Sequence, residues 1–475
     1  MLEPLTLPWP TGATIHLVGV GGAGMSSLAL ILRDAGYRVT GSDLVASSTI
    51  DGLRKQGIVI QVGHHSQNVG EASILVRSSA VPLDNPEIVS ATQRGTPVLK
   101  HSEALGALSR VRRTLAVAGT HGKTTTTAML ATILLQAGMD PTVLVGGVVP
   151  TLGSGAHWGT SDLLVAEADE FDRRFLDLQP EIAIVNNLEA DHLDYFGSIE
   201  AIVEAFEQFI QAVPDEGWRL LCADSPLAME LADLSPDRSV TYGLTESAEW
   251  QAIGISSNSL GGNDFYVMAN GTLVGHFRLA IPGRHNVSNA LAAAVAAGRI
   301  GVDFTTAAAA LEEFHGVERR LQRKGEQAGV VVYDDYGHHP TEIRVTLSAA
   351  REGQSGRLLC LFQPHTYHRL NALFEDFAEA FADADVVVVS DVYSPAGRGP
   401  SSGDRGAADL ASAIVDAEAH FGGSLDESIA LLVTLAAPGD MIVTMGAGDV
   451  TEAGTCLLAL LAERNARPSG GNRDC

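Results

Sequence analysis

The sequence predicts an α/β protein with three domains. Two glycine-rich turns each lie between an apolar strand and a helix. After about residue 316, a further set of apolar strands alternates with amphipathic helices. A chain of 475 residues is long enough for several separate cores. We therefore expect a Rossmann-like domain at 1–108, a P-loop ATPase domain at 109–315 and a doubly wound domain at 316–475.

The charge balance argues against nucleic acid or an anionic membrane as a partner. The formal net charge is −26, so a broad basic face is not expected. Anionic ligands must then be bound locally, by glycine loops, helix ends and a few Arg or Lys side chains.

The remaining composition indicates a globular cytoplasmic protein. The four cysteines are scattered without metal or disulfide spacing, which fits a reducing compartment. We find no signal peptide, and no apolar run reaches the ~18 residues of a membrane span. We expect a monomer or weak homodimer.

The first domain opens with a dinucleotide-type fingerprint. A strand at 14–20 runs into Gly19-Val-Gly21-Gly-Ala-Gly24, a helix extends from Met25 to about Ala35, and a strand at 38–42 ends at Asp43. The glycine loop would hold a diphosphate, with Ser42 or Asp43 at a neighbouring group. Further strands are expected at 58–62, 73–77 and 97–99, and loops such as Ser78-Ser79 follow strand ends, where ligands of such sheets bind.

The central domain is organised around a phosphate-binding loop. An apolar strand at 115–118 leads into Gly119-Thr-His-Gly122, and Lys123-Thr124 open a helix to about Gln136. Glycines let backbone N–H groups approach phosphate oxygens, and the helix N-terminus adds partial positive charge. Lys123 is placed to reach the β- and γ-phosphates, and the Thr124 hydroxyl to bind Mg²⁺.

Acidic clusters follow two apolar strands of this domain. The strand at 163–167 leads into Glu167-Ala-Asp169-Glu170-Phe-Asp172, and the strand at 182–186 into Asn186-Asn187-Leu-Glu189-Ala-Asp191-His192-Leu-Asp194. Carboxylates at strand ends suit Mg²⁺, which prefers oxygen ligands, although solvated loops are the alternative. Other strands are expected at 142–146 and 218–222, antiparallel hairpins over 239–281, and helices at 285–300 and 305–314.

The third domain carries polar residues after two of its strands. Strands are expected at 330–333, 358–362, 385–390 and 441–444, with helices at about 340–352, 369–382, 406–416 and 449–464. The first strand ends in Asp334-Asp335-Tyr336-Gly-His338-His339, and the second in Gln363-Pro-His365-Thr-Tyr-His368-Arg369.

Together these motifs resemble the Mur ligase family. The central marks are Gly119 to Thr124, Glu167-Ala-Asp-Glu, Glu189-Ala-Asp-His192 and His285-Asn286-Val-Ser-Asn289; the C-terminal marks are Gly316-Val-Glu-Arg319-Arg320-Leu and Asp334 to Glu342. The resemblance is strongest to the alanine-adding branch, through Gly19 to Met25, Asp335 to Glu342 and Gln363-Pro-His365. No lysine lies between Lys123 and Lys324, so the carbamylated lysine of several relatives is absent, as in that branch.

The resemblance implies an ATP-dependent ligase of peptidoglycan precursor synthesis, and so a part in cell-wall formation, cell shape and division. The carboxylate of UDP-N-acetylmuramate would become an acyl phosphate and be attacked by the amine of L-alanine, with ATP and Mg²⁺ required. A carboxylate needs this activation because its negative charge repels the amine and oxide is a poor leaving group.

The resemblance also implies residue roles. Lys123, Glu167 and His192 would be catalytic, and Thr124, Glu167 and His192 would bind Mg²⁺, although His192 could be a polar loop residue. ATP would contact Gly119, Thr120, His121, Gly122, Lys123, Thr124 and Thr125, with Asn286 and Asn289 at adenine and Arg320 and Asp335 at phosphate and ribose. Arg319 could be a surface charge. The UDP-sugar would contact Gly21, Gly22, Ala23, Gly24, Met25, Ser42, Asp43, Ser78 and Ser79, and L-alanine would contact Tyr336, His338, His365 and Arg369.

Other functions fit parts of the sequence. An NAD-dependent oxidoreductase would use the first fingerprint but leaves the P-loop and both acidic clusters unexplained. A P-loop regulatory module would bind its ligands without forming an amide. A related ligase could recycle a muramyl tripeptide or add a different amino acid.

Overall fold

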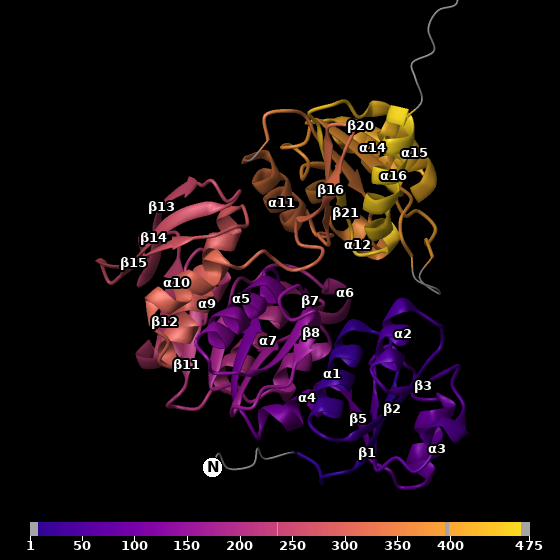
Figure 1. Cartoon of the computed structure of the whole chain (residues 1–475), viewed down its shortest axis with the longest axis vertical. Coiled ribbons are helices and arrows are strands. Elements are labelled where there is room, and N and C mark those ends of the chain that lie inside the picture. Colours follow the sequence, from indigo (N-terminus) through magenta and orange to yellow (C-terminus); the bar gives the residue numbers. More distant parts are fainter. Residues whose placement is uncertain (1–7, 235, 353, 395–398, 467–475) are drawn as a thin grey trace, which may run out of the picture. The chain divides into compact units, whose positions relative to one another are not determined.

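The computed structural model describes residues 8–466 except 235, 353 and 395–398. These form two compact units. The first contains the residues up to Ser256 together with Asp264–Ala280 and Asn286–Val317, and the second contains Ser257–Asn263, Ile281–His285 and the residues from Glu318 onward. A five-stranded and a ten-stranded sheet lie in the first unit and a six-stranded sheet in the second, which confirms the predicted α/β class (Figure 1).

The five-stranded sheet is wholly parallel, in the order β3-β2-β1-β4-β5. Its strands are β1 (Thr14–Val18), β2 (Arg38–Asp43), β3 (Val59–Val62), β4 (Ile74–Arg77) and β5 (Val98–Lys100). Its helices are α1 (Ala23–Asp34), α2 (Ser48–Lys55), α3 (Pro86–Gln93) and α4 (His101–Ser109), with a 3₁₀ turn, η1, at Ser66–Val69. The strand order reverses on the two sides of β1, and ligands of open α/β sheets bind beyond the strand ends at such a point.

The ten-stranded sheet has the order β15-β14-β13-β12-β11-β10-β6-β9-β7-β8. Its strands are β6 (Arg113–Ala118), β7 (Thr142–Val149), β8 (Ser154–His157), β9 (Leu163–Glu167), β10 (Ile182–Val185), β11 (Trp218–Cys222), β12 (Ser239–Gly243), β13 (Trp250–Ser257), β14 (Asn263–Ala269) and β15 (Thr272–Arg278). The helices are α5 (Lys123–Gln136), α6 (Leu193–Phe196), α7 (Ile199–Gln211), α8 (Pro226–Glu230), α9 (Arg284–Arg299) and α10 (Phe304–Glu312), with 3₁₀ turns η2 (Phe171–Asp177), η3 (Ala232–Leu234) and η4 (Pro236–Arg238).

Strand β6 and helix α5 form the centre of this sheet. β6 pairs in parallel with both β9 and β10, and the predicted helix from Lys123 to Gln136 is confirmed. Most residues of α5 from Thr124 to Leu134 are buried, so the helix is covered on nearly all sides. This burial holds the start of α5 in place at the carboxyl end of β6.

The hairpins predicted over 239–281 are only partly correct. β14 and β15 form an antiparallel hairpin through a turn in which Asn270 and Gly271 both have positive φ, at 46° and 77°. β12 and β13, however, pair in parallel. The Asp224 carboxylate accepts the backbone N–H groups of Leu244 (2.7 Å) and Thr245 (2.9 Å), and this turns the chain away directly after β12.

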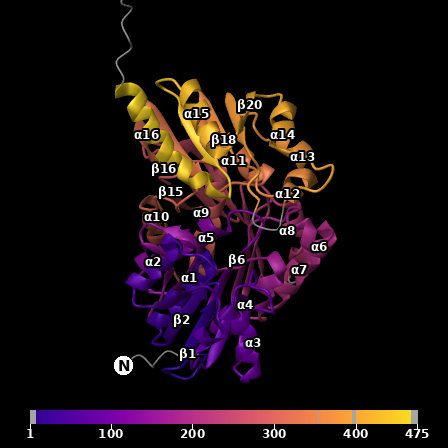
Figure 2. The same cartoon turned by 90° about the vertical axis from the view of Figure 1, so that its right-hand side faces the viewer.

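The six-stranded sheet of the second unit has the order β16-β17-β21-β18-β19-β20, and only the β16–β17 pair is antiparallel. Its strands are β16 (Gln322–Gln327), β17 (Val330–Asp335), β18 (Leu358–Phe362), β19 (Val386–Ser390), β20 (Glu418–Gly423) and β21 (Met441–Met445). Its helices are α11 (Pro340–Glu352), α12 (Tyr367–Ala372), α13 (Phe374–Ala378), α14 (Ala407–Ala413), α15 (Leu425–Leu435) and α16 (Ala453–Ala466), with a 3₁₀ turn, η5, at Asp449–Glu452. Helices α15 and α16 pack side by side (Figure 2).

One expectation for this unit is wrong, and three of its elements were not predicted. The helix predicted at 369–382 is interrupted at Leu373, which separates α12 from α13. The edge strands β16 and β20 and the helix α15 were not predicted, because the two strands carry polar or half-exposed residues without the apolar run of a central strand. Among the described residues, no helix is long and apolar enough to cross a membrane.

Within the first unit, the five-stranded sheet's helices pack against the ten-stranded sheet's segments. Helix α1 contacts β7 and β8, and α4 contacts η2. At Gly106 of α4 the approach is so close that a Cβ would lie 2.4 Å from the Asp177 carbonyl oxygen. Glycine is therefore required where α4 meets η2.

We expect Gly106→Ala to destabilise the protein by roughly 1–3 kcal/mol, because the added methyl forces α4 away from η2. Urea unfolding monitored by circular dichroism would measure the change. Gly52→Ala in α2 is the matched control, since nothing lies within 4 Å of its added Cβ. An equal effect of the two substitutions would contradict the close packing described for α4.

Candidate active site

The P-loop follows β6, and both of its glycines adopt conformations that favour glycine. Gly119 has φ 131° and Gly122 has φ 78°. A Cβ on Gly119 would lie 3.0 Å from the Asn187 backbone nitrogen, and one on Gly122 would lie 2.6 Å from Asn289 Oδ1. The loop therefore needs glycine both for its backbone and for its neighbours.

Lys123 is fully engaged by the protein. Its Nζ donates to the carbonyl oxygens of Gly119 (2.6 Å) and Thr120 (3.1 Å) and to both carboxylate oxygens of Glu170 (2.8 and 3.0 Å). Burial lowers the pKa of Lys123, but the charges of Glu170 and Asp169 outweigh it and raise the pKa. Burial raises the pKa of Glu170 to about 7, although the Lys123 charge opposes this. The Lys123 ammonium thus stays charged, and its side-chain partner in this structure is Glu170.

Thr124 and Glu167 meet as the sequence predicts. The Thr124 hydroxyl donates to Glu167 Oε1 (3.0 Å), and the Gly146 backbone N–H donates to Oε2 (2.7 Å). These oxygens from α5 and from the end of β9 are ligands of the kind that Mg²⁺ prefers.

His192 has different neighbours. It has a left-handed backbone, with φ 52°, and its Nε2 lies 3.7 Å from Asp191 Oδ2. Its ring lies 4.8 Å from that of Phe171, which directly follows Glu170. His192 therefore lies beside the segment after β9, and its predicted part in metal binding stays a prediction.

Asparagine side chains form hydrogen bonds with the P-loop and with the helix that follows it. Asn187 Oδ1 accepts the His121 backbone N–H (2.7 Å), and Asn186 Nδ2 donates to Thr126 Oγ1 (3.0 Å). Thr126 in turn donates to Asn289 Oδ1 (3.1 Å).

The predicted adenine residues lie in this network. Asn289 Nδ2 donates to Asn286 Oδ1 (3.2 Å), and both side chains are largely buried. The structure thus places Asn286 and Asn289 against the P-loop helix, and their role toward adenine stays a prediction. Thr125 is also buried, so ligand contact at this position would come from its backbone.

The first glycine loop is tied to the end of β2. Asp43 Oδ2 accepts the Gly21 backbone N–H (2.8 Å), and a Cβ on Gly19 would lie 3.0 Å from Ser78 Cβ. Gly22, Ala23 and Gly24 are exposed, and Ser79 is half-buried. The loop, Asp43, Ser78 and Ser79 are thus brought to one edge of the sheet, whereas the Met25 side chain lies in the core.

Ser42 belongs to a buried network centred on Glu87. Glu87 Oε2 accepts from Ser42 Oγ (2.6 Å) and lies 3.0 Å from His16 Nε2, while Oε1 accepts from Asn68 Nδ2 (2.7 Å) and the His65 backbone N–H (3.1 Å). Burial would raise the pKa of Glu87, but the hydrogen bonds from His16, Ser42 and Asn68 outweigh it and lower the pKa to about 2. Glu87 thus fastens the loop after β3 to β2, and Ser42 faces this network with no exposed surface.

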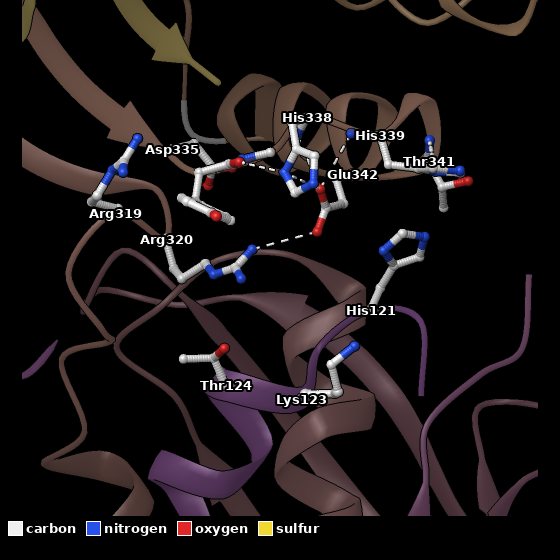
Figure 3. Close-up of polar contacts among 12 residues, drawn as sticks. His121, Lys123, Thr124, Arg319, Arg320, Asp335, His338, His339, Thr341 and Glu342 are labelled. Carbon is white, nitrogen blue, oxygen red and sulfur yellow. Dashed lines mark hydrogen bonds and ion pairs between the residues drawn. The ribbon is translucent and has the colours of Figure 1, made fainter. Parts of the chain in front are cut away.

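In the second unit, Asp335 and Arg320 lie near one another. Asp335 accepts the backbone N–H groups of Gly337 and Leu321 (both 2.7 Å), and burial raises its pKa to about 6 while Arg320 opposes the shift. Arg320 forms an ion pair with Glu342 (3.5 Å), which also accepts the His338 N–H (3.0 Å) (Figure 3). Glu342 is thus shared by Arg320 and the start of α11.

Arg319 is not the surface charge that the sequence suggested. Its Nη2 donates to the Gly446 carbonyl oxygen (2.6 Å), and its Nε lies 3.5 Å from Asp334 Oδ2. Because Asp334 is fully buried, Arg319 serves as the internal partner of that carboxylate.

The predicted alanine-binding residues form an aromatic row in this unit. The rings of Tyr336 and His338 are 5.2 Å apart, those of His338 and His365 are 5.9 Å apart, and His365 stacks on Tyr393 at 5.5 Å. Arg369 lies in the first turn of α12, where Thr366 Oγ1 accepts its backbone N–H (3.5 Å). Tyr393 completes the row and was missed because it lies far from the others in sequence.

Comparisons with known proteins cover nearly the whole chain. Residues 14–113 match the Mur ligase family, catalytic domain; residues 117–297 the Mur ligase middle domain; and residues 319–448 the Mur ligase, glutamate ligase domain. The UDP-N-acetylmuramate–L-alanine ligase of Geotalea daltonii is 43% identical over 453 residues, which cover 94% of this chain and 98% of the relative. The chain belongs to the Mur ligase family.

Solved structures agree with this membership. The UDP-N-acetylmuramate-alanine ligase of Thermotoga maritima superposes with a TM-score of 0.80 at 30% identity, covering 95% of this chain and 99% of that one. A murein peptide ligase of Psychrobacter arcticus gives a TM-score of 0.71 at 29% identity, with the same coverage. A second sequence relative, the UDP-N-acetylmuramate–L-alanine ligase of Pelotomaculum thermopropionicum, is 44% identical over 459 residues, which cover 94% of this chain and 98% of the relative.

Some residues of this Mur ligase site were not singled out from sequence. Glu170 binds Lys123, and Asn186 connects the end of β10 to Thr126. Their signal was present, because both are polar residues at or just beyond the ends of apolar strands. Sequence alone did not show which of the neighbouring polar residues turns toward the P-loop.

We expect Glu87→Gln to lower the free energy of unfolding at pH 7 by about 3 kcal/mol, because it removes a buried, hydrogen-bonded charge. The folded pKa is about 2 and the ordinary value 4.5, so this stabilisation is complete above pH 4.5 and is lost as the pH falls toward 2. Urea unfolding of wild type and variant between pH 7 and pH 3 would measure the difference, which should narrow on acidification.

The exposed Glu71 provides the control. Glu71→Gln should leave the unfolding free energy nearly unchanged at every pH. A difference between wild type and Glu87→Gln that stays constant from pH 7 to pH 3 would contradict the role given to the Glu87 carboxylate.

Proposed function

We propose that this chain is an ATP-dependent ligase that joins the carboxylate of UDP-N-acetylmuramate to the amine of L-alanine. The observation that carries the proposal is the P-loop with its buried Lys123 and its Thr124–Glu167 pair, in a chain about 43% identical to named L-alanine ligases. The product would be a peptidoglycan precursor. We place the activity in the cytoplasm, where its ATP and UDP-linked sugar substrates are found.

The nucleotide-sugar would bind at the first glycine loop. Its diphosphate would lie against Gly21 and accept hydrogen bonds from the backbone N–H groups of residues 22–24 at the start of α1, where the helix dipole is positive, since the Gly21 N–H is already bound to Asp43. Ser78 and Ser79 follow β4 at the same edge of the sheet and would contact the rest of the nucleotide. Asp43 would act chiefly by holding Gly21 in place.

The phosphates of ATP would bind at the P-loop. Lys123 would exchange Glu170 for the β- and γ-phosphates and stabilise the charge that develops during phosphoryl transfer. Thr124 and Glu167, with His192, would hold Mg²⁺, which when bound neutralises phosphate charge. The Thr124–Glu167 oxygen pair fits this ion, because hard oxygen donors are what it requires. Arg320 and Asp335 remain predicted ATP contacts of the second unit.

L-Alanine would bind in the second unit at the aromatic row. Arg369 would pair with its carboxylate, and His365, His338 and Tyr336 would surround the small side chain and the amine. The amine must lose its proton before it attacks the activated carboxylate.

The direct test is ADP release with UDP-N-acetylmuramate, ATP and Mg²⁺ while amino acids are varied one at a time. Dependence on L-alanine is expected, with L-serine or glycine as weak substitutes at most. Dependence on a muramyl tripeptide-type peptide instead would favour a recycling ligase, of which the Psychrobacter arcticus murein peptide ligase is a structural neighbour. Nicotinamide reduction without ADP release would favour an oxidoreductase.

We expect Lys123→Ala to reduce ADP release by at least about a thousand-fold, because the charge of the transferred phosphoryl group loses its fixed cation. The affinity for UDP-N-acetylmuramate should stay nearly unchanged, since the first glycine loop belongs to the other sheet of the unit. Steady-state kinetics and calorimetric titration would measure both.

Lys55→Ala, at an exposed lysine of α2, is the charge-matched control and should keep full activity. If Lys123→Ala lost nucleotide-sugar binding and ADP release to the same extent, the two ligands would not be on separate sheets as proposed.

A further inference from the structure

The segment after β9 has a strained backbone that the core holds in place. We call residues 169–174 the acidic loop. Asp172 and Arg173 have left-handed φ values of 57° and 52°, which non-glycine residues adopt at a cost. Asp169 accepts the backbone N–H of Phe171 at Oδ1 (3.1 Å), and Phe175 beyond the loop stacks on Phe209 at 4.8 Å.

Each carboxylate of the acidic loop is paired with a cation. Asp169 pairs with Arg174 (2.9 Å), Glu170 with Lys123 (2.8 Å) and Asp172 with Lys100 (3.5 Å). Cations are scarce in this chain, with 31 Lys and Arg against 57 Asp and Glu, so their gathering here is informative. Lys123 is the phosphate-binding residue of the proposed site, so Glu170 occupies a place meant for a substrate anion. In the same way, Asp169 at Arg174 could occupy the place of a second substrate anion.

Arg174 is only partly satisfied by the protein. Nη1 bonds Asp169, whereas Nε is buried without a hydrogen-bond partner among the described residues. The guanidinium carbon lies 5.2 Å from the Phe171 ring centre, and 28% of the side chain is exposed. A partly buried cation with an unused donor in a strained loop calls for an explanation.

The neighbours of Arg174 place it between the two predicted ligand sites. His101 donates to the Gly24 carbonyl oxygen and is close enough to Arg174 and Asp169 for their charges to affect it. A Cβ on Gly24 would lie 3.2 Å from two atoms of the His101 ring, so the last glycine of the loop is needed to admit this histidine. Asp169 also lies within electrostatic reach of Lys123.

We propose that Arg174 binds the carboxylate of the nucleotide-sugar substrate, and that Asp169 takes the place of that carboxylate in the ligand-free protein. The inference rests on the proposed function and deepens it by naming the cation that receives the reacting group. The diphosphate belongs on the glycine loop beside His101 and the γ-phosphate on Lys123, so the carboxylate must lie between them, and Arg174 is the cation at that place.

An arginine suits this task for two reasons. Its planar guanidinium can bind a carboxylate through two parallel hydrogen bonds, which orients the group as well as holding it. Its positive charge also offsets the repulsion between the carboxylate and the nearby γ-phosphate. The incoming carboxylate would take over the guanidinium contact that Asp169 now makes.

The test compares two nucleotide-sugars by calorimetric titration of the full chain. UDP-N-acetylmuramate carries the carboxylate, and UDP-N-acetylglucosamine has the same nucleotide and diphosphate without it. Arg174→Gln should weaken binding of UDP-N-acetylmuramate roughly ten- to a hundred-fold, the range for a charge-assisted hydrogen bond, and leave UDP-N-acetylglucosamine binding unchanged. Arg174→Lys, which keeps the charge but not the planar fork, should fall between wild type and Arg174→Gln.

Arg173→Gln is the matched control. It removes the same charge from the adjacent position, but Arg173 contacts Gln208 (3.4 Å) and Phe196 instead, so both affinities should stay at wild-type values. ATP affinity measured on the same samples reports whether the P-loop is intact.

The outcomes are distinguishable. Equal weakening of both nucleotide-sugars by Arg174→Gln would assign Arg174 to the diphosphate and overturn the proposal, as would unchanged binding of both. If wild-type protein forms no amide from UDP-N-acetylmuramate, the proposed function fails, and that result is read from ADP release rather than from these affinities.

Discussion

The rest of the site depends on the buried ammonium of Lys123. A buried charge needs a partner, and here the carbonyl oxygens of Gly119 and Thr120 and the carboxylate of Glu170 surround it. This single group links the P-loop and the start of α5 to Glu170 in the loop after β9, 47 residues further along the chain. The conformations of the P-loop and of the loop after β9 are therefore set together.

A second buried charge organises the five-stranded sheet in the same way. Glu87 binds His16, Ser42 and Asn68, and so joins β1, β2 and the loop after β3. The first glycine loop is tied to β2 through Asp43, so its position depends indirectly on this network. His101 approaches Gly24 of the first glycine loop, and Arg174 pairs with Asp169, which is within electrostatic reach of Lys123, so these residues connect the two predicted ligand sites of the first unit.

Much of the fold was predictable because its signals are local. The strand–glycine–helix pattern around Lys123 gave the helix bounds correctly, and the helix at 340–352 also matches the structure. The predictions failed where the local sequence pattern does not show how a strand pairs with its neighbours. Nothing near Gly243 shows that Asp224 turns the chain into a parallel pair, and the half-exposed β16 and β20 lack the apolar run by which a central strand is found.

By itself the sequence determined the α/β class, the glycine turns, the lysine at the start of α5 and the acidic residues at strand ends, because each follows from the chemistry of neighbouring residues. Only the tertiary structure decided which groups lie next to each other: Glu170 rather than Asp169 at Lys123, Asn289 at Thr126, Ser42 at Glu87, and His101 at Gly24. The physical reason is that parallel sheets bring the carboxyl ends of distant strands to one edge. Strand order, which no single segment encodes, therefore chooses the partners.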